Sequence, residues 1–240
     1  MIEKKQSWVD SLLVYKDIRM VRILLLGAIS GFPWVLIASS LSLWLKEEGL
    51  SRSTIGWAGL IFGVYAFNYL WAPIIDRINK FSHIIGVVLI VVGTILGGYD
   101  VIFTEELKFN YSIFRGFGIL IIGLTFIKGS FFSTINKISS KLGHRRTWIV
   151  SMQIIILLCL IFWSYIDPNE NLALLITVGL IIAIASATQD ITVDALRIEQ
   201  INENEGKSMA AGAAMAVVGW WTGYKLGGVI ALFTAEYFEN

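Results

Sequence analysis

Charged residues are scarce in this sequence of 240 residues: Asp, Glu, Lys and Arg make up 15%, whereas hydrophobic residues make up 56%. Soluble domains carry about 25% charged residues. Together with a mean hydropathy of +0.71, this composition excludes an ordinary soluble domain and predicts an integral membrane protein. The net charge is only +1 and no basic stripe or basic helix is present, so we expect no nucleic-acid partner.

Cysteine and histidine are also scarce, and each shortage removes a class of site. The single cysteine, Cys159, lies within an apolar run, so it forms no internal disulfide and no zinc framework. The two histidines, His83 and His144, are far apart in the sequence and lie at the edges of predicted loops. We therefore expect neither a metal site nor a cofactor.

Long apolar runs, in contrast, are abundant. A helix needs roughly 20 mostly apolar residues to cross the hydrocarbon core of a bilayer. Seven runs qualify, at 23–45, 54–75, 81–99, 111–132, 147–166, 171–189 and 208–234, and short polar segments connect them. The pattern predicts an all-α integral membrane fold with about seven membrane helices.

Basic residues are distributed unevenly among the connecting segments. If the N-terminus is cytoplasmic, the inner segments hold 13 Lys and Arg residues and the outer segments hold 3. Cytoplasmic loops carry an excess of Lys and Arg. We therefore expect a multi-pass protein in the lipid bilayer whose N-terminus is a retained cytoplasmic lead-in rather than a signal peptide.

The last run combines a stripe of small residues with one lysine. The small residues recur every three or four positions, at Gly212, Ala216, Gly219, Gly223 and Gly227. Such a stripe lets two membrane helices approach closely. Lys225 lies about 200° around the helix from Gly223 and so faces away from this seam. There it lines a cavity, pairs with a carboxylate on a neighbouring helix, or reaches outward to the headgroups.

The run at 171–189 ends on charged residues at helical spacing. Asp190, Asp194 and Arg197 share one narrow face of a helix, and Ser186 continues that face into the apolar run. Three interpretations stay open. The helix simply leaves the membrane here with a surface pair between Asp194 and Arg197, the carboxylates latch the cytoplasmic mouth, or one of them carries a proton.

The latch interpretation needs basic partners on the same side of the membrane. Such groups occur in two segments that the predicted topology also places on the cytoplasmic side. The gate and proton-coupling candidates are therefore Asp190, Asp194, Arg197, Asp76, Arg77, Arg145 and Arg146.

Three blocks of the sequence together resemble the AmpG-type muropeptide permeases, a branch of the major facilitator superfamily. They are "YKDIRMVRILLLGAISGFPWVLIASSLSLWLKEEGLSRSTIG" (15–56), "FNYLWAPIIDRI" (67–78) and "SATQDITVDALRIE" (186–199). The resemblance covers nearly all of 15–77 and 143–235, and the order and spacing of the blocks make it specific.

The resemblance implies a proton-driven symporter of the bacterial inner membrane, with two six-helix lobes and alternating access. Its cargo would be an anhydro-muramyl sugar peptide or a related small anionic solute, without an enzymatic step. The family often has a lysine where this sequence has Asn68 and an arginine where it has Trp221, so the cargo or its binding mode differs here. The substrate-cavity candidates are Lys225, Trp221, Asn68, Tyr65, Pro33 and Gln189.

Two departures from the family define the domains that we expect. Residues 1–77 hold the lead-in and helices one and two, residues 143–240 hold helices three to five, and residues 78–142 form an inserted hairpin of two membrane helices. The hairpin is expected because 65 residues separate two motifs, Asp76-Arg77 and Gly143-His144-Arg145-Arg146, that the family joins directly. The chain stops after the equivalent of the family's fifth helix, so we expect a fragment of a carrier whose C-terminal lobe is missing.

Two other functions fit single features of the sequence. Asp190 and Asp194 would hold Mg²⁺ in a membrane prenyl or phospho-alcohol transferase, but the second acidic cluster that such enzymes need is missing. A retinal protein would use Lys225 in its last helix, but such proteins have the opposite N-terminal orientation. No predicted helix carries the membrane-embedded aspartate counter-ion that this lysine would require.

Overall fold

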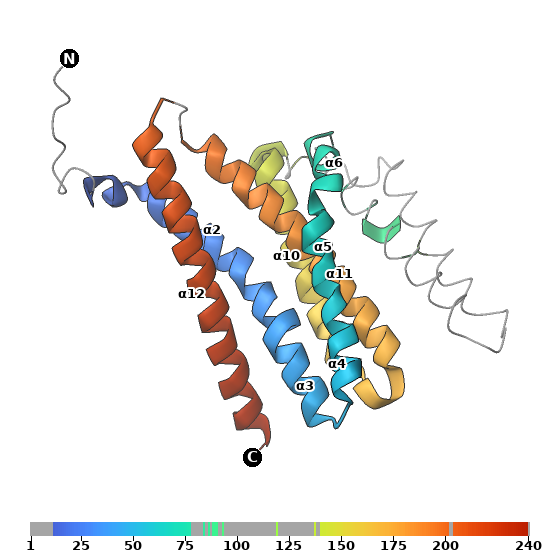
Figure 1. Cartoon of the computed structure of the whole chain (residues 1–240). Helices are drawn as coiled ribbons and strands as arrows, with labels where there is room; N and C mark the ends of the chain where they lie inside the picture. Colours follow the sequence, from blue (N-terminus) through green and yellow to red (C-terminus); the bar gives the residue numbers. More distant parts are fainter. Residues whose placement is uncertain are drawn as a thin grey trace. The chain divides into compact units, whose positions relative to one another are not determined.

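The computed structural model of the chain is all-helical in the residues that it describes (Figure 1). These are residues 12–77, 84, 86, 88–90, 93, 119, 137, 140–201 and 204–239, without the side chains of 238 and 239. The inserted hairpin predicted for 78–142 lies outside the described residues except for isolated positions and the start of the segment that leads into α10.

Four helices are long and apolar enough to cross a membrane, judged by length and composition. The first, Ile18–Glu47, is a continuous stretch of α2 (Ile18–Val35), η2 (Leu36–Ser40) and α3 (Leu41–Glu47), and it follows the short η1 (Val14–Lys16). The others are α10 (His144–Trp163), α11 (Pro168–Glu199) and α12 (Gly206–Glu239). They coincide with the predicted runs at 23–45, 147–166, 171–189 and 208–234.

The predicted run at 54–75 forms a series of short helices instead of one long helix. The series is α4 (Arg52–Ala58), η3 (Gly59–Phe62), α5 (Gly63–Phe67), η4 (Asn68–Leu70) and α6 (Ala72–Arg77). The backbone leaves the α conformation at Phe67 and again at Trp71. Glycines within the run lower its helix propensity, and Pro73 has no N–H to donate to the carbonyl of Tyr69.

Local side-chain and backbone features determine where several helices begin. The Asp17 carboxylate accepts a hydrogen bond from the backbone N–H of Arg19 at 2.8 Å and so caps α2. Ser51 caps α4 in the same way through the N–H of Thr54 at 3.2 Å. Gly143, immediately before α10, has a φ of +86°, which glycine adopts without strain.

The winding of the first long helix changes after a proline. Pro33 lies inside α2 and lacks the N–H that would bond the carbonyl four residues earlier. The next segment, Leu36–Ser40, is a π-helical turn before α3 resumes regular winding. Such turns occur frequently at functional sites, so Leu36–Ser40 is a place to look for one.

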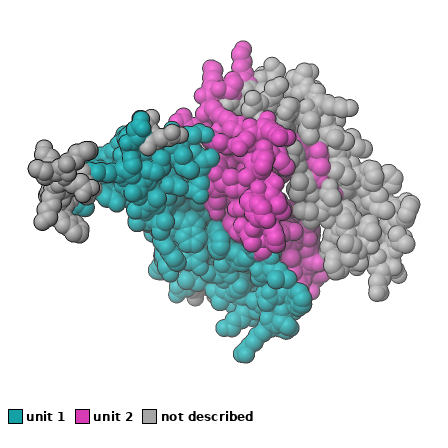
Figure 2. Space-filling model, turned by 45° about the horizontal axis from the view of Figure 1, so that its top comes forward, with its two compact units in different colours: residues 1–62, 193–240 teal, residues 63–192 magenta. Residues whose placement is uncertain are grey.

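The described chain divides into two units, which Figure 2 distinguishes by colour. Unit 1 comprises residues 1–62 and 193–240, and unit 2 comprises residues 63–192. The division falls within α11, so this helix contributes its last two turns to unit 1 and the rest to unit 2.

Unit 1 is built around a seam between α2 and α12, which run side by side in the same direction (Figure 1). A Cβ atom added to Gly219 would overlap the backbone carbonyl of Leu24. One added to Gly223 would overlap the carbonyl of Ala28. The second contact lies four residues further along the chain than the first on both helices, as expected for two parallel helices.

Glycines of α2 approach the backbone of α12 just as closely. A Cβ atom on Gly27 would overlap the carbonyl of Ala216, and one on Gly31 would overlap that of Trp220. The backbones of the two helices are therefore in direct contact, which only small residues allow. The small-residue stripe predicted for the last run is confirmed as a close helix contact, and its partner is α2.

Candidate functional site

Unit 2 brings charged side chains together at the end of α6 and the start of α10. Asp76 and Arg145 form an ion pair with 2.6 Å between Oδ1 and Nη1, although the two residues are 69 positions apart in the sequence. Arg77 and Arg146 follow them in the chain and are exposed. Four of the predicted gate residues thus belong to this end of unit 2.

The middle of α11 carries polar side chains that are buried within unit 2. Ser186 and Gln189 are fully buried, and Asp190 is half-buried. The Gln153 side-chain amide of α10 donates a hydrogen bond to the Gln189 side-chain oxygen. Buried polar groups need such partners. A simple membrane span does not need a buried glutamine, so this part of α11 is a candidate for function.

Tyr65 of α5 joins these residues. Its hydroxyl is near the Ser186 hydroxyl and the Asp190 carboxylate, although no hydrogen bond joins it to Ser186. The residues Tyr65, Gln153, Ser186, Gln189 and Asp190 are called the polar group of unit 2 below. The sequence analysis named four of them, Ser186 and Asp190 on one helix face and Tyr65 and Gln189 as cavity candidates. It missed Gln153, which has no spacing signal relative to α11.

The carboxylates of the predicted Asp190–Asp194–Arg197 face have different surroundings. Asp194 and Arg197 form an (i, i+3) ion pair at 3.2 Å, and the Asp194 side chain is 66% exposed. This is the surface pair of the simplest interpretation, and such pairs contribute little stability. Contact of Asp190 or Asp194 with Arg77, Arg145 or Arg146 stays a prediction. Within the described ranges, no three His, Cys, Asp or Glu side chains come together to hold a metal ion.

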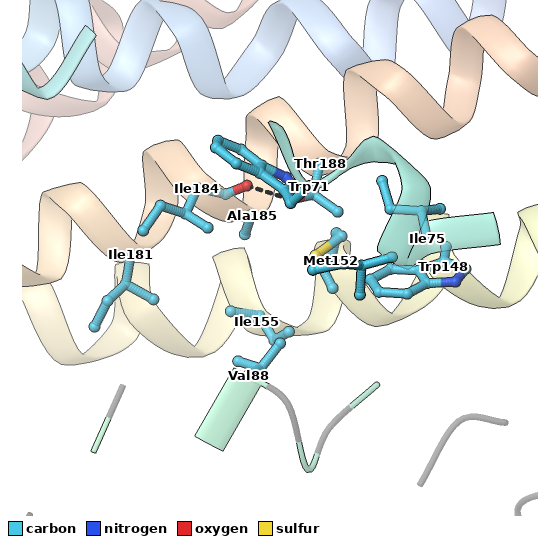
Figure 3. Close-up of a pocket in the computed structure, with 11 residues that line it drawn as sticks. Trp71, Ile75, Val88, Trp148, Met152, Ile155, Ile181, Ile184, Ala185 and Thr188 are labelled. Atoms are coloured by element: carbon cyan, nitrogen blue, oxygen red, sulfur yellow. Dashed lines mark hydrogen bonds between the residues drawn. The ribbon is translucent and has the colours of Figure 1, made fainter. Parts of the chain in front are cut away.

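A separate apolar pocket of about 270 Å³ lies in unit 2 (Figure 3). Its walls come from α10 and α11 and from the segment around α6, and the Trp71 indole N–H donates a hydrogen bond to the Thr188 hydroxyl at 3.0 Å. The lining residues are Trp71, Ile74, Ile75, Val88, Trp148, Met152, Ile155, Ile181, Ile184, Ala185 and Thr188. No predicted site residue lines it, and its wall offers hydrocarbon contacts rather than recognition of a charged solute.

Of the six residues predicted to line a substrate cavity, three lie in unit 1. Pro33 is buried in α2, whereas Trp221 and Lys225 of α12 are exposed. The ammonium of Lys225 lies 6.0 Å from the centre of the Trp221 ring. Lys225 is on the face of α12 away from the glycine seam, as its spacing from Gly223 predicts. Asn68, the remaining candidate, lies half-buried in η4 of unit 2.

A second charged cluster in unit 1 was not predicted from the sequence. The Arg19 guanidinium lies 2.6 Å from Asp17 and 2.8 Å from Glu205, and it also donates to the carbonyl of Gln200 at 3.3 Å. The hydrogen bond from Arg19 lowers the pKa of the Asp17 carboxyl below its ordinary value. The cluster ties the start of α2 to the segment between α11 and α12, and no local spacing could have revealed a contact across 186 residues.

The chain is similar to curated proteins that are named as AmpG transporters. It is 26% identical over 227 residues to "Putative transporter AmpG 4" of Rickettsia felis, covering 95% of this chain and 41% of that protein. It is 24% identical over 223 residues to "Anhydromuropeptide permease" of Escherichia coli K12, covering 93% of this chain and 33% of that protein. It is 26% identical over 225 residues to "Putative transporter AmpG 3" of Rickettsia prowazekii, covering 94% of this chain and 40% of that protein.

The chain thus spans about a third to two fifths of the length of the curated relatives that it matches. No model of a protein family and no solved structure matches it. The resemblance stated from the three sequence blocks is confirmed by these relatives.

Proposed function

We propose that these helices form the first lobe of a secondary transporter of the AmpG type, in a multi-pass protein of the bacterial inner membrane with a cytoplasmic N-terminus. The observation that carries the proposal is the similarity of 93–95% of the chain to relatives named as transporters or permeases. Four apolar helices of membrane-spanning length support it. The magnesium-dependent transferase and the retinal protein have no such support.

The proposed cargo is an anhydro-muropeptide or a related small anionic solute. This follows from the name of the Escherichia coli relative, which is a permease for anhydro-muropeptides. The solute would move together with protons, so that the proton gradient drives its import. The transporter would then alternate between inward-open and outward-open states by rocking against a second lobe.

Asp190 is the proposed proton carrier. It is the half-buried carboxylate of the polar group of unit 2, with the Tyr65 hydroxyl as its neighbour. Binding a proton removes its charge, and a neutral carboxyl is much easier to bury in apolar surroundings than a carboxylate. Protonation of Asp190 would therefore change the relative stability of the two states. Asp194 is less suited, because it is exposed and pairs with Arg197.

The charged cluster of Asp76, Arg77, Arg145 and Arg146 is the proposed gate. The ion pair between Asp76 and Arg145 already joins α6 to α10 in unit 2. A gate of this kind holds one state closed and opens when its ion pairs exchange partners, with Asp190 or Asp194 as the alternative acidic partner. Exposed and half-exposed pairs are weak, which suits a contact that must break in every cycle.

The test is uptake of a labelled anhydro-muropeptide by cells that express the complete gene encoding these residues, with an imposed pH gradient. We expect Asp190→Asn to reduce proton-driven accumulation more than tenfold, because the amide cannot carry a proton. The matched control, Asp194→Asn, should reduce it less than twofold.

A second readout separates coupling from cargo binding. Exchange of labelled for unlabelled cargo at equal pH on both sides needs no net proton movement. Asp190→Asn should retain this exchange. Equal accumulation by wild type and Asp190→Asn would show that Asp190 is not the proton carrier. Absence of uptake by the wild type would contradict an anhydro-muropeptide as the cargo.

A further inference from the structure

The apolar pocket of unit 2 is too large to be an ordinary packing void. Its volume is about 270 Å³, and its walls come from α10, α11 and the segment around α6 (Figure 3). Protein interiors contain few voids larger than one water molecule. An apolar cavity of about 150 Å³ is already large enough to bind benzene. The size of this pocket therefore indicates a binding site.

Two polar groups on the pocket wall are bonded within the wall itself. The Trp71 indole N–H donates to the Thr188 hydroxyl at 3.0 Å, and that hydroxyl donates to the carbonyl of Ile184 at 2.7 Å. Most of the other lining side chains are aliphatic. A water molecule needs two to four polar partners to be held in a cavity. The pocket therefore favours a hydrocarbon over water.

The pocket extends from one end of α10 toward the middle of that helix. Both α10 and α11 have the length and composition of membrane spans. On α10 the lining runs from Trp148 to Ile155, which places it about 6–16 Å from the first residue, His144, at 1.5 Å per residue. The hydrocarbon core of a bilayer is about 30 Å thick. The pocket thus covers the depth at which the acyl chains of one leaflet lie.

Polar side chains continue the lining face of α10 beyond the pocket. His144 and Arg145 share one face of this helix, about 100° wide, with the pocket residues Trp148, Met152 and Ile155. Both ring nitrogens of His144 are buried and make no hydrogen bond to any residue that the structure describes. Buried polar groups normally have a partner. A ligand at this end of the pocket would supply one.

The same end of the pocket carries a positive charge. Arg145 pairs with Asp76 at 2.6 Å, and the exposed Arg77 follows that aspartate directly. Two arginines against one aspartate leave the end positive. Basic pockets between membrane helices bind the headgroups of anionic lipids, and charge-assisted hydrogen bonds to phosphate are strong. The charge therefore complements a phosphate at the point where the apolar wall ends.

We propose that this pocket binds an anionic phospholipid. One acyl chain fills the space between α10 and α11, and the phosphate lies at the start of α10. There His144 donates a hydrogen bond to the phosphate, and Arg77 supplies positive charge. The site requires these helices to lie in a bilayer, but it does not depend on the transport of a solute.

The test uses phosphatidylglycerol with a photoactivatable diazirine in the middle of one acyl chain. The complete protein is delipidated in detergent, mixed with one equivalent of this lipid and irradiated, and mass spectrometry maps the labelled residues. We expect Met152, Ile155 and Ala185 to be labelled at least about fivefold more than Leu157 and Leu158, because a pocket encloses most of its ligand. The two leucines of α10 are 58% and 60% exposed, so they report non-specific contact with lipid.

Filling the pocket should exclude the acyl chain. Ile155→Trp should reduce labelling at Met152 and Ala185 at least about fivefold, because the larger side chain occupies the space. Ile154→Trp, at a neighbouring position that is 40% exposed and outside the pocket wall, should leave this labelling unchanged. Ala185→Leu is a second, smaller filling variant on α11. Thermal unfolding without lipid shows which variants are folded before their labelling is compared.

A second lipid tests the contact with the phosphate. Diacylglycerol with the same diazirine chain has no phosphate and should label the pocket at least about threefold less than phosphatidylglycerol. Arg77→Gln should remove this difference. Arg146→Gln should retain it, because Arg146 is about 200° around α10 from Trp148 and so lies on the opposite face.

Three results would overturn the proposal. Equal labelling of the pocket residues and of the two exposed leucines would show that the pocket holds no lipid. Unchanged pocket labelling in folded Ile155→Trp and Ala185→Leu would show that the chain binds elsewhere. Equal labelling by phosphatidylglycerol and diacylglycerol would overturn the phosphate contact and leave a purely apolar ligand as the occupant.

Discussion

The seam of unit 1 and the polar group of unit 2 are two different ways to pack helices in an apolar environment. Along the seam, α2 and α12 meet backbone to backbone, and glycines leave no side chain that could rearrange. In unit 2, α10 and α11 meet through side chains such as Gln153 and Gln189, which have several rotamers. A protein that changes state needs some helix contacts that stay fixed and others that rearrange. We therefore expect the seam to stay fixed and the polar group to exchange hydrogen-bond partners.

The largest expected effect comes from one methyl group in the seam. A Cβ at Gly223 would overlap the backbone carbonyl of Ala28, which cannot move without shifting the whole helix. Gly223→Ala should therefore lower the free energy of unfolding by about 3 kcal/mol. Thermal unfolding in detergent measures the loss.

The control for this variant is a glycine with open space. Nothing lies within 4 Å of a Cβ added to Gly56 in α4. Gly56→Ala should be neutral or stabilise by about 0.5 kcal/mol, because alanine favours helix. Equal loss of stability in Gly56→Ala and Gly223→Ala would contradict the description of the seam as closely packed.

A smaller effect is expected in the polar group. Gln189→Leu should cost about 1–3 kcal/mol, because it leaves the Gln153 amide without this acceptor. The double variant Gln153→Leu/Gln189→Leu should recover most of that loss, since no amide of the pair is then buried alone. Unfolding curves of the two single variants and the double variant form a complete cycle. Additive losses would show that the two amides do not depend on each other.

The Arg19 cluster should contribute less than a fully buried network, because its side chains are about 30% exposed. Arg19→Gln should lower the free energy of unfolding, because Asp17, Glu205 and the Gln200 carbonyl each lose a hydrogen-bond donor. Arg22→Gln removes a nearby exposed arginine and should change it by less than about 0.5 kcal/mol. Unfolding curves measure both losses of stability. Equal losses in Arg19→Gln and Arg22→Gln would show that the Arg19 cluster does not stabilise the fold.

The smallest expected effect is the pH dependence of Asp17. Its pKa is lowered in the folded state, so its stabilising contribution is complete above the ordinary value of about 3.9 and is lost as the pH falls through the lower folded-state pKa. The difference in unfolding temperature between wild type and Asp17→Asn should accordingly shrink below pH 4. In an Arg19→Gln background the lowering by the side-chain hydrogen bond disappears while the hydrogen bond from the backbone N–H remains, so the difference should depend less on pH. The same pH profile in both backgrounds would rule out Arg19 as the cause.

Hydropathy predicted the four long helices well, because a membrane span is a property of composition over about 20 residues. It did not predict the interruption of the run at 54–75. The side chains from Ile55 to Ile75 are apolar except for Asn68, so hydropathy averaged over the run gives no sign of the backbone changes at Phe67 and Trp71. Glycine and proline in that run were the available signal.

Short-range geometry of the site was also predictable. The spacing of Asp194 and Arg197 indicated their pair, and the glycine stripe indicated a close helix contact. The partners across long separations were not predictable, because one sequence contains no information on which helices are neighbours. The contact of Arg19 with Glu205 belongs to this class, as does that of Ser39 with Tyr224.

The parallel seam also dictates an order of events during synthesis of the protein. Arg19 and Glu205 mark the starts of the two seam helices and are 186 residues apart. A ribosome that adds 5–20 residues per second needs roughly 10–40 s for that distance. Throughout this interval α2 is in the membrane with its glycine face in contact with lipid or with other helices. Any chain whose synthesis stops before α12 therefore lacks the helix that packs against this face.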